Sequence, residues 1–127
     1  MPDAFTPPDS TSAGTANAYR DLTIANGASL SDAVDLGRLS PVGILIPATW
    51  TAAVLTFQGS PDGVTYGKMC DTAGEVQIAS VAGGEYVVLN PLAFGGVRFL
   101  KVRSGTAAAA VAQGGARTLR LVGRVMP

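Results

Sequence analysis

The sequence predicts an all-β protein, an antiparallel β-sandwich of jelly-roll type preceded by an extended N-terminal arm. Three observations lead to this prediction. Short apolar segments are interrupted by turn residues at the spacing of about 8 to 12 residues that is typical of sandwiches and barrels. Several of these segments alternate apolar and polar side chains with a period of two. No segment is a convincing helix, and 127 residues suffice for one domain with its own core.

The clearest single element is a hairpin around the turn Ser60-Pro61-Asp62-Gly63. Before the turn, Leu55 and Phe57 alternate with polar neighbours, as in a strand with one buried face. The turn itself has suitable chemistry, because Pro presets φ, Asp accepts local hydrogen bonds and Gly tolerates a positive φ. Val64 and Tyr66 then resume the alternation, so a second strand is expected directly after the turn.

The same pattern predicts about nine strands along the chain. They are expected at residues 22–24, 30–36, 41–46, 54–58, 64–70, 75–81, 85–89, 97–103 and 118–125. The alanine-rich stretch 107–112 has a high helix propensity, but it is short and flanked by glycines, so a strand is favoured there as well. Phe57 and Phe99, each in the middle of a strand, are the strongest candidates for the core.

Residues 1–19 are predicted to form the arm, and residues 20–127 the sandwich domain. Pro7 and Pro8 impose an extended backbone and prevent a helix. Phe5 and Tyr19 are the only large apolar side chains of the arm. Two interpretations remain open at this point: a disordered tail, or a strap that lies on a neighbouring subunit with Phe5 as its anchor.

The residues that enzymes and metal sites require are nearly absent. The chain contains no His, which excludes a Ser-His-Asp triad, a Cys-His pair and a His-based metal site. Cys70 is the single cysteine, so it cannot form an intramolecular disulfide. The spacing of Asp32 and Asp35 matches no calcium loop, and Glu75 and Glu85 are explained as solvated residues at strand starts. The sequence therefore predicts no catalytic residue, no metal site, no cofactor and no enzymatic activity.

Charged residues are few and unevenly distributed. Nine basic and nine acidic residues make up only 14% of the chain, which suggests that partners cover part of the surface. Residues 1–35 contain five Asp and one Arg, whereas every charged residue after Glu85 is basic. Pairing of the acidic part with a basic sheet face carrying Arg98 and Arg120, in the same or a neighbouring chain, would account for both ends. The zero net charge and the scarcity of aromatic residues argue against direct nucleic-acid binding.

No targeting or membrane-spanning segment is expected. The first residues contain neither a basic region nor an apolar core of a signal peptide, and no stretch of eighteen consecutive apolar residues occurs. The protein is therefore expected to be made and folded in a cytoplasm.

Four segments together resemble a known class of proteins: TIANGASLS (23–31), LTFQGSPDG (55–63), AFGGVRFLKVRSG (93–105) and RTLRLV (117–122). Their order and spacing are similar to those of small β-sandwich virion accessory proteins of tailed bacteriophages, such as capsid decoration and head-fibre proteins. The resemblance covers about residues 22–124 and leaves the arm outside it. It implies a structural role and no catalytic residues.

The expected function is that of a capsid decoration (cement) protein in the virion, made in the host cytoplasm. It would lie on the capsid surface where subunits of the major capsid protein meet, as a homotrimer. The candidate partner contacts are Phe5, Pro7, Pro8, Tyr19, Trp50, Arg98 and Arg120. One alternative is a carbohydrate-binding module of a head fibre or tail tip, which would use exposed aromatic residues such as Trp50, Tyr66 and Tyr86. A second alternative is a tail or neck structural subunit.

Overall fold

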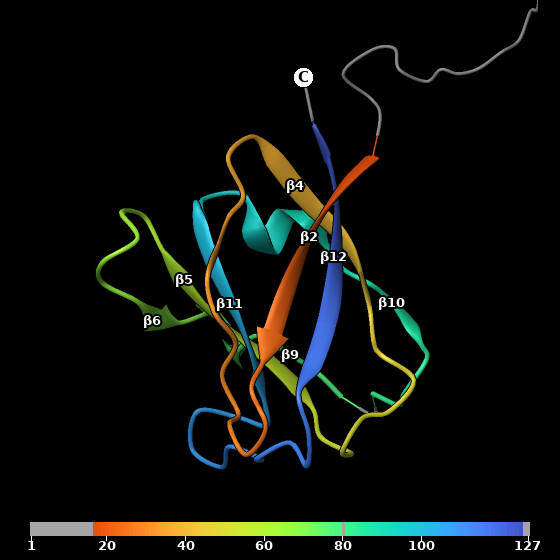
Figure 1. Ribbon diagram of the computed structural model, residues 1–127. Helices are drawn as coiled ribbons and strands as arrows, with labels where there is room; N and C mark the ends of the chain where they lie inside the picture. Colours follow the sequence, from red (N-terminus) through yellow and green to blue (C-terminus); the bar gives the residue numbers. More distant parts are fainter. Residues whose placement is uncertain (1–16, 80, 126–127) are drawn as a thin grey trace, which may run out of the picture.

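The computed structural model describes residues 17–79 and 81–125, which form two antiparallel sheets packed against each other (Figure 1). The first sheet has the order β10-β4-β12-β2, with β2 (Asn17–Ile24), β4 (Leu39–Leu45), β10 (Tyr86–Val88) and β12 (Arg117–Val125). The second has the order β3-β11-β5-β6, with β3 (Val34–Asp35), β5 (Leu55–Ser60), β6 (Gly67–Lys68) and β11 (Phe99–Ser104). β9 (Gln77–Ile78) also pairs with β5, and β7 (Cys70–Asp71) pairs with β8 (Gly74–Glu75). The predicted all-β sandwich is confirmed.

Alternating side chains from both sheets fill one core. In β12, Leu119 and Leu121 are buried while Arg120 between them is exposed, which is the expected period of two. The first sheet contributes Leu22, Ile24, Ile44, Leu119 and Leu121. The second sheet contributes Leu55, Phe57, Leu100 and Val102. Because these side chains face each other across the sandwich, their burial fixes which residues each sheet presents to solvent.

The predicted boundary between arm and domain needs a correction. β2 begins at Asn17, before the predicted boundary at Arg20, because Asn17 pairs with Arg124 and Tyr19 with Val122 on β12. Phe5, Pro7 and Pro8 lie outside the described residues.

A short 3-10 helix, η1 (Pro91–Phe94), was not predicted. The Asn90 side chain accepts a hydrogen bond of 3.1 Å from the backbone N–H of Leu92, and Pro91 occupies the start, where its missing N–H is not needed. The helix places Phe94 in the core, edge-on to the Phe57 ring with 5.2 Å between the centroids. The Asn-Pro pair, interpreted as a strand end, is therefore also a helix start.

The turn of the predicted hairpin is confirmed, but the strand after it is not. Gly63 has φ +80°, and the Ser60 hydroxyl accepts from its N–H at 2.9 Å. The Asp62 carboxylate accepts from the backbone N–H groups of Val64 and Thr65 at 2.8 and 3.0 Å. Because these donors bond locally, they cannot pair with β5, and the second strand, β6, begins only at Gly67.

Two other predicted strands are mostly loops. Of residues 30–36, only β3 is a strand, because the side chains of Ser31 and Asp32 bond to neighbouring backbone. The Ser31 hydroxyl accepts a hydrogen bond of 2.9 Å from the Val102 N–H. The Asp32 carboxylate accepts one of 2.9 Å from the Thr23 N–H. The alanine-rich stretch 107–112 takes part in a single isolated β-bridge, between Gly105 and Ala110. It begins with a turn in which Thr106 and Ala109 exchange two backbone hydrogen bonds.

Phe99 was wrongly assigned to the core. It is half-buried and lies on the outer face of β11 with Lys101, because Leu100 and Val102 occupy the core positions. Its ring lies beneath the Arg98 guanidinium, at 5.2 Å from the centroid. Phe57, in contrast, is completely buried.

These two rings give a matched test of the core. Phe57→Ala should lower the free energy of unfolding by about 3–5 kcal/mol, because it removes a fully buried ring. Phe99→Ala should cost clearly less, since part of that ring already faces solvent. Chemical denaturation of both variants measures the difference, and equal losses would contradict the placement of Phe99.

Candidate interaction surface

The outer face of the first sheet presents large apolar side chains to solvent. Tyr19 is 55% exposed, Leu45 41%, Tyr86 51% and Val88 80%, and Val122 lies among them half-buried. Strand pairing places them side by side, because Tyr86 is opposite Leu45 and Val122 is opposite Tyr19. We call this surface, formed by Tyr19, Leu45, Tyr86, Val88 and Val122, the exposed face. A cluster of exposed apolar side chains that extends across a sheet is typical of a contact surface.

Gly43 gives the ring of Tyr86 its place on this face. A Cβ atom at position 43 would overlap the phenol of Tyr86, so the ring lies directly over the β4 backbone. Any larger residue at position 43 would displace the ring. The glycine therefore contributes to the shape of the exposed face.

An ion pair lies between Tyr19 and Leu45. The Arg120 guanidinium donates two hydrogen bonds to the Asp21 carboxylate, at 2.9 and 3.2 Å, and lies 4.0 Å from the centroid of the Tyr19 ring. The hydrogen bond from Arg120 is the main reason why the pKa of Asp21 is lower than usual, and the same pair raises the pKa of Arg120. Since the two charges neutralise each other, they add polar specificity without a net charge.

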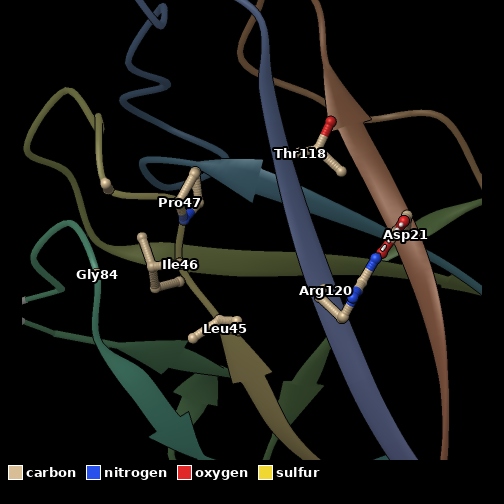
Figure 2. A pocket seen from close by; sticks show the side chains of 8 residues that line it. Asp21, Leu45, Ile46, Pro47, Gly84, Thr118 and Arg120 are labelled. Carbon is tan, nitrogen blue, oxygen red and sulfur yellow. Dashed lines mark hydrogen bonds and ion pairs between the residues drawn. The ribbon is translucent and has the colours of Figure 1, made fainter.

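A shallow cavity of about 370 Å³ opens beside this ion pair (Figure 2). Its lining residues are Asp21, Leu45, Ile46, Pro47, Ala48, Gly84, Thr118 and Arg120. Polar groups come from the β2 and β12 side, and apolar groups from the end of β4. The apolar exposed face therefore lies beside a cavity whose wall is polar on the side of β2 and β12 and apolar on the side of β4.

The outer face of the second sheet is partly covered. Thr56 is completely buried there and Arg103 is only 6% exposed. The Glu75 carboxylate accepts from the Arg103 guanidinium at 3.5 Å and from the Ala107 N–H at 3.2 Å, so it connects two loops to the sheet. Lys101 on the same face lies 4.3 Å from the centroid of the Tyr66 ring. Among the described strands, the exposed large apolar side chains all lie on the first sheet.

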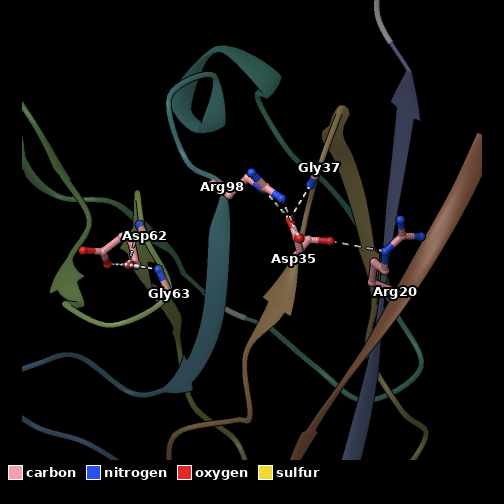
Figure 3. Close-up of polar contacts among 7 residues, drawn as sticks. Arg20, Asp35, Gly37, Asp62, Gly63 and Arg98 are labelled. Carbon is pink, nitrogen blue, oxygen red and sulfur yellow. Dashed lines mark hydrogen bonds and ion pairs between the residues drawn. The ribbon is translucent and has the colours of Figure 1, made fainter.

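Another exposed ion pair lies at the edge of the second sheet, beside a hydrogen bond that connects the two sheets (Figure 3). The Asp35 carboxylate accepts two hydrogen bonds from Arg98, at 2.7 and 3.0 Å, and one from the Gly37 N–H at 2.9 Å. The backbone carbonyl of Asp35 accepts from Arg20 of β2 at 3.4 Å. The bonds from Arg98 and then Gly37 are the largest causes of the lowered pKa of Asp35. Two acidic residues of the segment 1–35, Asp21 and Asp35, thus pair with Arg120 and Arg98 within the chain, whereas the acidic residues of the arm lie outside the described residues.

The structure separates the predicted contact residues. Tyr19 and Arg120 lie together on the outer side of the first sheet, whereas Arg98 lies beside β3. Trp50 is half-buried against the core, and its indole N–H is buried without an acceptor among the described residues. Phe5 and the two prolines lie outside the described part of the chain.

Sequence reasoning missed Leu45, Val88 and Val122 as surface residues. Residues 41–46 and 86–89 are apolar on both faces of their strands, a pattern that a fully buried strand also has. A strand that is apolar on both faces, in a sheet covered on one side, is also the pattern of an interface strand.

Within residues 17–79 and 81–125, no three or more Cys, Asp or Glu side chains are grouped so that they could hold a metal ion. The described part of the chain also contains no helix that is long and apolar enough to cross a membrane.

The fold is similar to that of a solved phage-derived protein. The SPBc2 prophage-derived protein YomS superposes with a TM-score of 0.51, over 85% of this chain and 94% of that chain, at 11% sequence identity. No protein-family model and no curated protein matches the sequence. At this identity the similarity concerns the arrangement of the strands.

The two exposed ion pairs predict a pH dependence of stability. The pKa values of Asp21 and Asp35 are lower in the folded protein than in the unfolded chain. The ionised carboxylates therefore stabilise the fold at any pH above the unfolded pKa of about 3.9. This stabilisation is lost as the pH falls through their pKa values in the folded protein. The variant Asp21→Asn/Asp35→Asn should have a lower thermal midpoint than the wild type at pH 7. This gap should close below about pH 4.

Asp71→Asn is the matched control. The Asp71 carboxylate accepts a hydrogen bond from the backbone N–H of Ala73, and the side-chain oxygen of Asn can accept the same bond. Its midpoint should follow that of the wild type at each pH. A gap between the double variant and the wild type that stays constant from pH 7 to pH 2 would contradict the role of the ion pairs.

Proposed function

We propose that this protein is a structural protein of a phage virion, a capsid decoration protein that lies on the capsid surface and has no enzymatic activity. The observation that carries the proposal is the difference between the two outer faces. One is partly covered by the chain's own loops, whereas the other presents Tyr19, Leu45, Tyr86 and Val88 to solvent. In this proposal the exposed face contacts subunits of the major capsid protein.

Three further features support a structural role in a virion. The fold resembles that of a prophage-derived protein, and the sequence segments named above resemble phage virion accessory proteins. The exposed face has no net charge from its central ion pair, which fits contact with protein better than contact with nucleic acid. Low overall charge fits a chain whose surface is partly covered in its assembly.

The proposal includes a homotrimer and an N-terminal arm. Capsid subunits often meet around local symmetry axes, and a closed ring of three copies would match a threefold axis. The arm would extend the contact area to neighbouring subunits, with Phe5 as its apolar anchor.

The cavity beside the ion pair favours a second candidate, a carbohydrate-binding module of a head fibre or tail tip. Asp21, Arg120 and Thr118 offer carboxylate, guanidinium and hydroxyl groups on one wall, which are suitable partners for sugar hydroxyls. Tyr19, beside Arg120, supplies an aromatic ring. Binding of a glycan that Asp21→Ala abolishes, in a protein that does not attach to capsids, would favour this candidate.

The composition of virions tests the main proposal. Particles made from the genome that encodes this chain should contain it at a copy number comparable to that of the major capsid protein, as measured by quantitative mass spectrometry. A small number of copies per particle would indicate a neck or tail subunit, and absence from purified particles would refute a role in the virion.

Substitutions on the exposed face test the surface. Leu45→Glu should weaken attachment to undecorated capsids by about tenfold or more, because an apolar side chain buried on docking is replaced by a charge. Val64→Glu is the matched control, since Val64 is 81% exposed in the loop between β5 and β6. Cosedimentation with capsids gives both affinities, and equal affinities would contradict docking through the exposed face.

A further inference from the structure

A second apolar feature lies beside the exposed face. It is a cleft of about 150 Å³ whose lining residues come from β9, β10, η1 and their neighbouring residues. Its apolar walls are formed by Phe57, Val76, Ile78, Leu89, Ala93 and Phe94. Since Phe57 and Phe94 belong to the core, the cleft extends from the surface to the core.

The size and chemistry of the cleft fit one aromatic ring. An apolar cavity of about 150 Å³ can hold a benzene molecule. Gln77 and Asn90, the polar lining residues, are both exposed, and no charged residue lines the cleft. At its edge, Val88 is 80% exposed, and Leu92 of the adjoining η1 is 87% exposed. Apolar side chains left in solvent around an apolar cleft indicate that a partner covers them.

We propose that this cleft binds the Phe5 side chain of a second copy of this chain. Phe5 is the only aromatic residue among residues 1–16, which precede β2. The chain from Phe5 to Asn17 can span up to about 40 Å when extended, at roughly 3.3–3.6 Å per residue. Pro7 and Pro8 restrict the backbone next to Phe5, which lowers the entropy lost on binding.

The strand order places β2, which this segment precedes in the sequence, and β10, which contributes to the cleft, at opposite edges of the first sheet. β2 and β10 are its two edge strands, so each copy has a donor edge and an acceptor edge at different places. A contact between different edges of two copies is heterologous, and it forms a closed ring if the rotation that relates the copies closes. The inference extends the proposed function by naming the contact between copies, and its test uses the free protein without particles.

The binding test uses a labelled synthetic peptide of residues 1–16 and the full-length Phe5→Ala protein, whose own segment lacks the ring. Fluorescence anisotropy should show saturable binding of the peptide. A peptide carrying Phe5→Ala should bind about ten- to a hundredfold more weakly, the effect of removing one buried Phe side chain.

Substitutions in the acceptor locate the site. Ala93→Met, which fills the cleft, should prevent peptide binding, whereas Ala107→Met at an exposed alanine of the 105–112 loop should not. Leu92→Lys at the exposed edge should also weaken binding, and it is useful because a surface substitution leaves the fold intact. Circular dichroism and the thermal midpoint verify that each variant is folded.

Sedimentation velocity of the full-length protein completes the test. The wild type should associate with increasing concentration, and Phe5→Ala should shift it toward the monomer. Equal binding of both peptides, or binding unaffected by Ala93→Met and Leu92→Lys, would overturn the assignment of the cleft. A wild type that stays monomeric at all concentrations would overturn the assignment to a second copy. None of these outcomes would decide whether the protein attaches to capsids, because the cosedimentation experiment measures that attachment separately.

Discussion

The structure depends on the burial of alternate side chains from two sheets against each other. On β12, Leu119 and Leu121 must point into the core, and Arg120 and Val122 must then point out. A slip of one residue would exchange the two faces, so the apolar core fixes the register of the whole sheet. The exposed face follows from this constraint, because the same register that fills the core places Tyr19 beside Val122 and Tyr86 beside Leu45.

Buried polar contacts hold the connecting loops on this frame. Gln113 is almost completely buried, and its side chain bonds to the backbone of Thr51, to the Ser104 hydroxyl and to Arg117 at 2.7 to 3.1 Å. Glu75 fixes two loops over the second sheet in a similar way. Since these loops are held at one end and over one outer face, the opposite face stays open for contact with a partner.

The sequence predicted the fold class and the positions of β4, β5, β11 and β12, because apolar segments and period-two alternation report burial, but it predicted only the last three residues of β2. It failed where side chains compete with the backbone for hydrogen bonds. Asp62, Ser31 and Asp32 take donors that a strand ladder would need, and Asn90 starts a helix that no periodicity announces. The ion pairs were foreseen from the separation of acidic and basic residues. Of the exposed face, the sequence indicated Tyr19 as a partner contact and Tyr86 as an exposed aromatic residue of the alternative function. It did not indicate Leu45, Val88 and Val122, since an apolar side chain on a strand does not distinguish a core from an interface.

The central claim is that the first sheet docks on a capsid, and the orientation of the protein on the particle tests it most directly. A cryo-electron microscopy reconstruction of the virion resolves which side of the sandwich faces the shell. The account predicts that β10, β4, β12 and β2 face the capsid, with Tyr86, Leu45 and Tyr19 in the contact. A reconstruction in which the loops covering the second sheet face the shell, with the first sheet exposed to solvent, would contradict it.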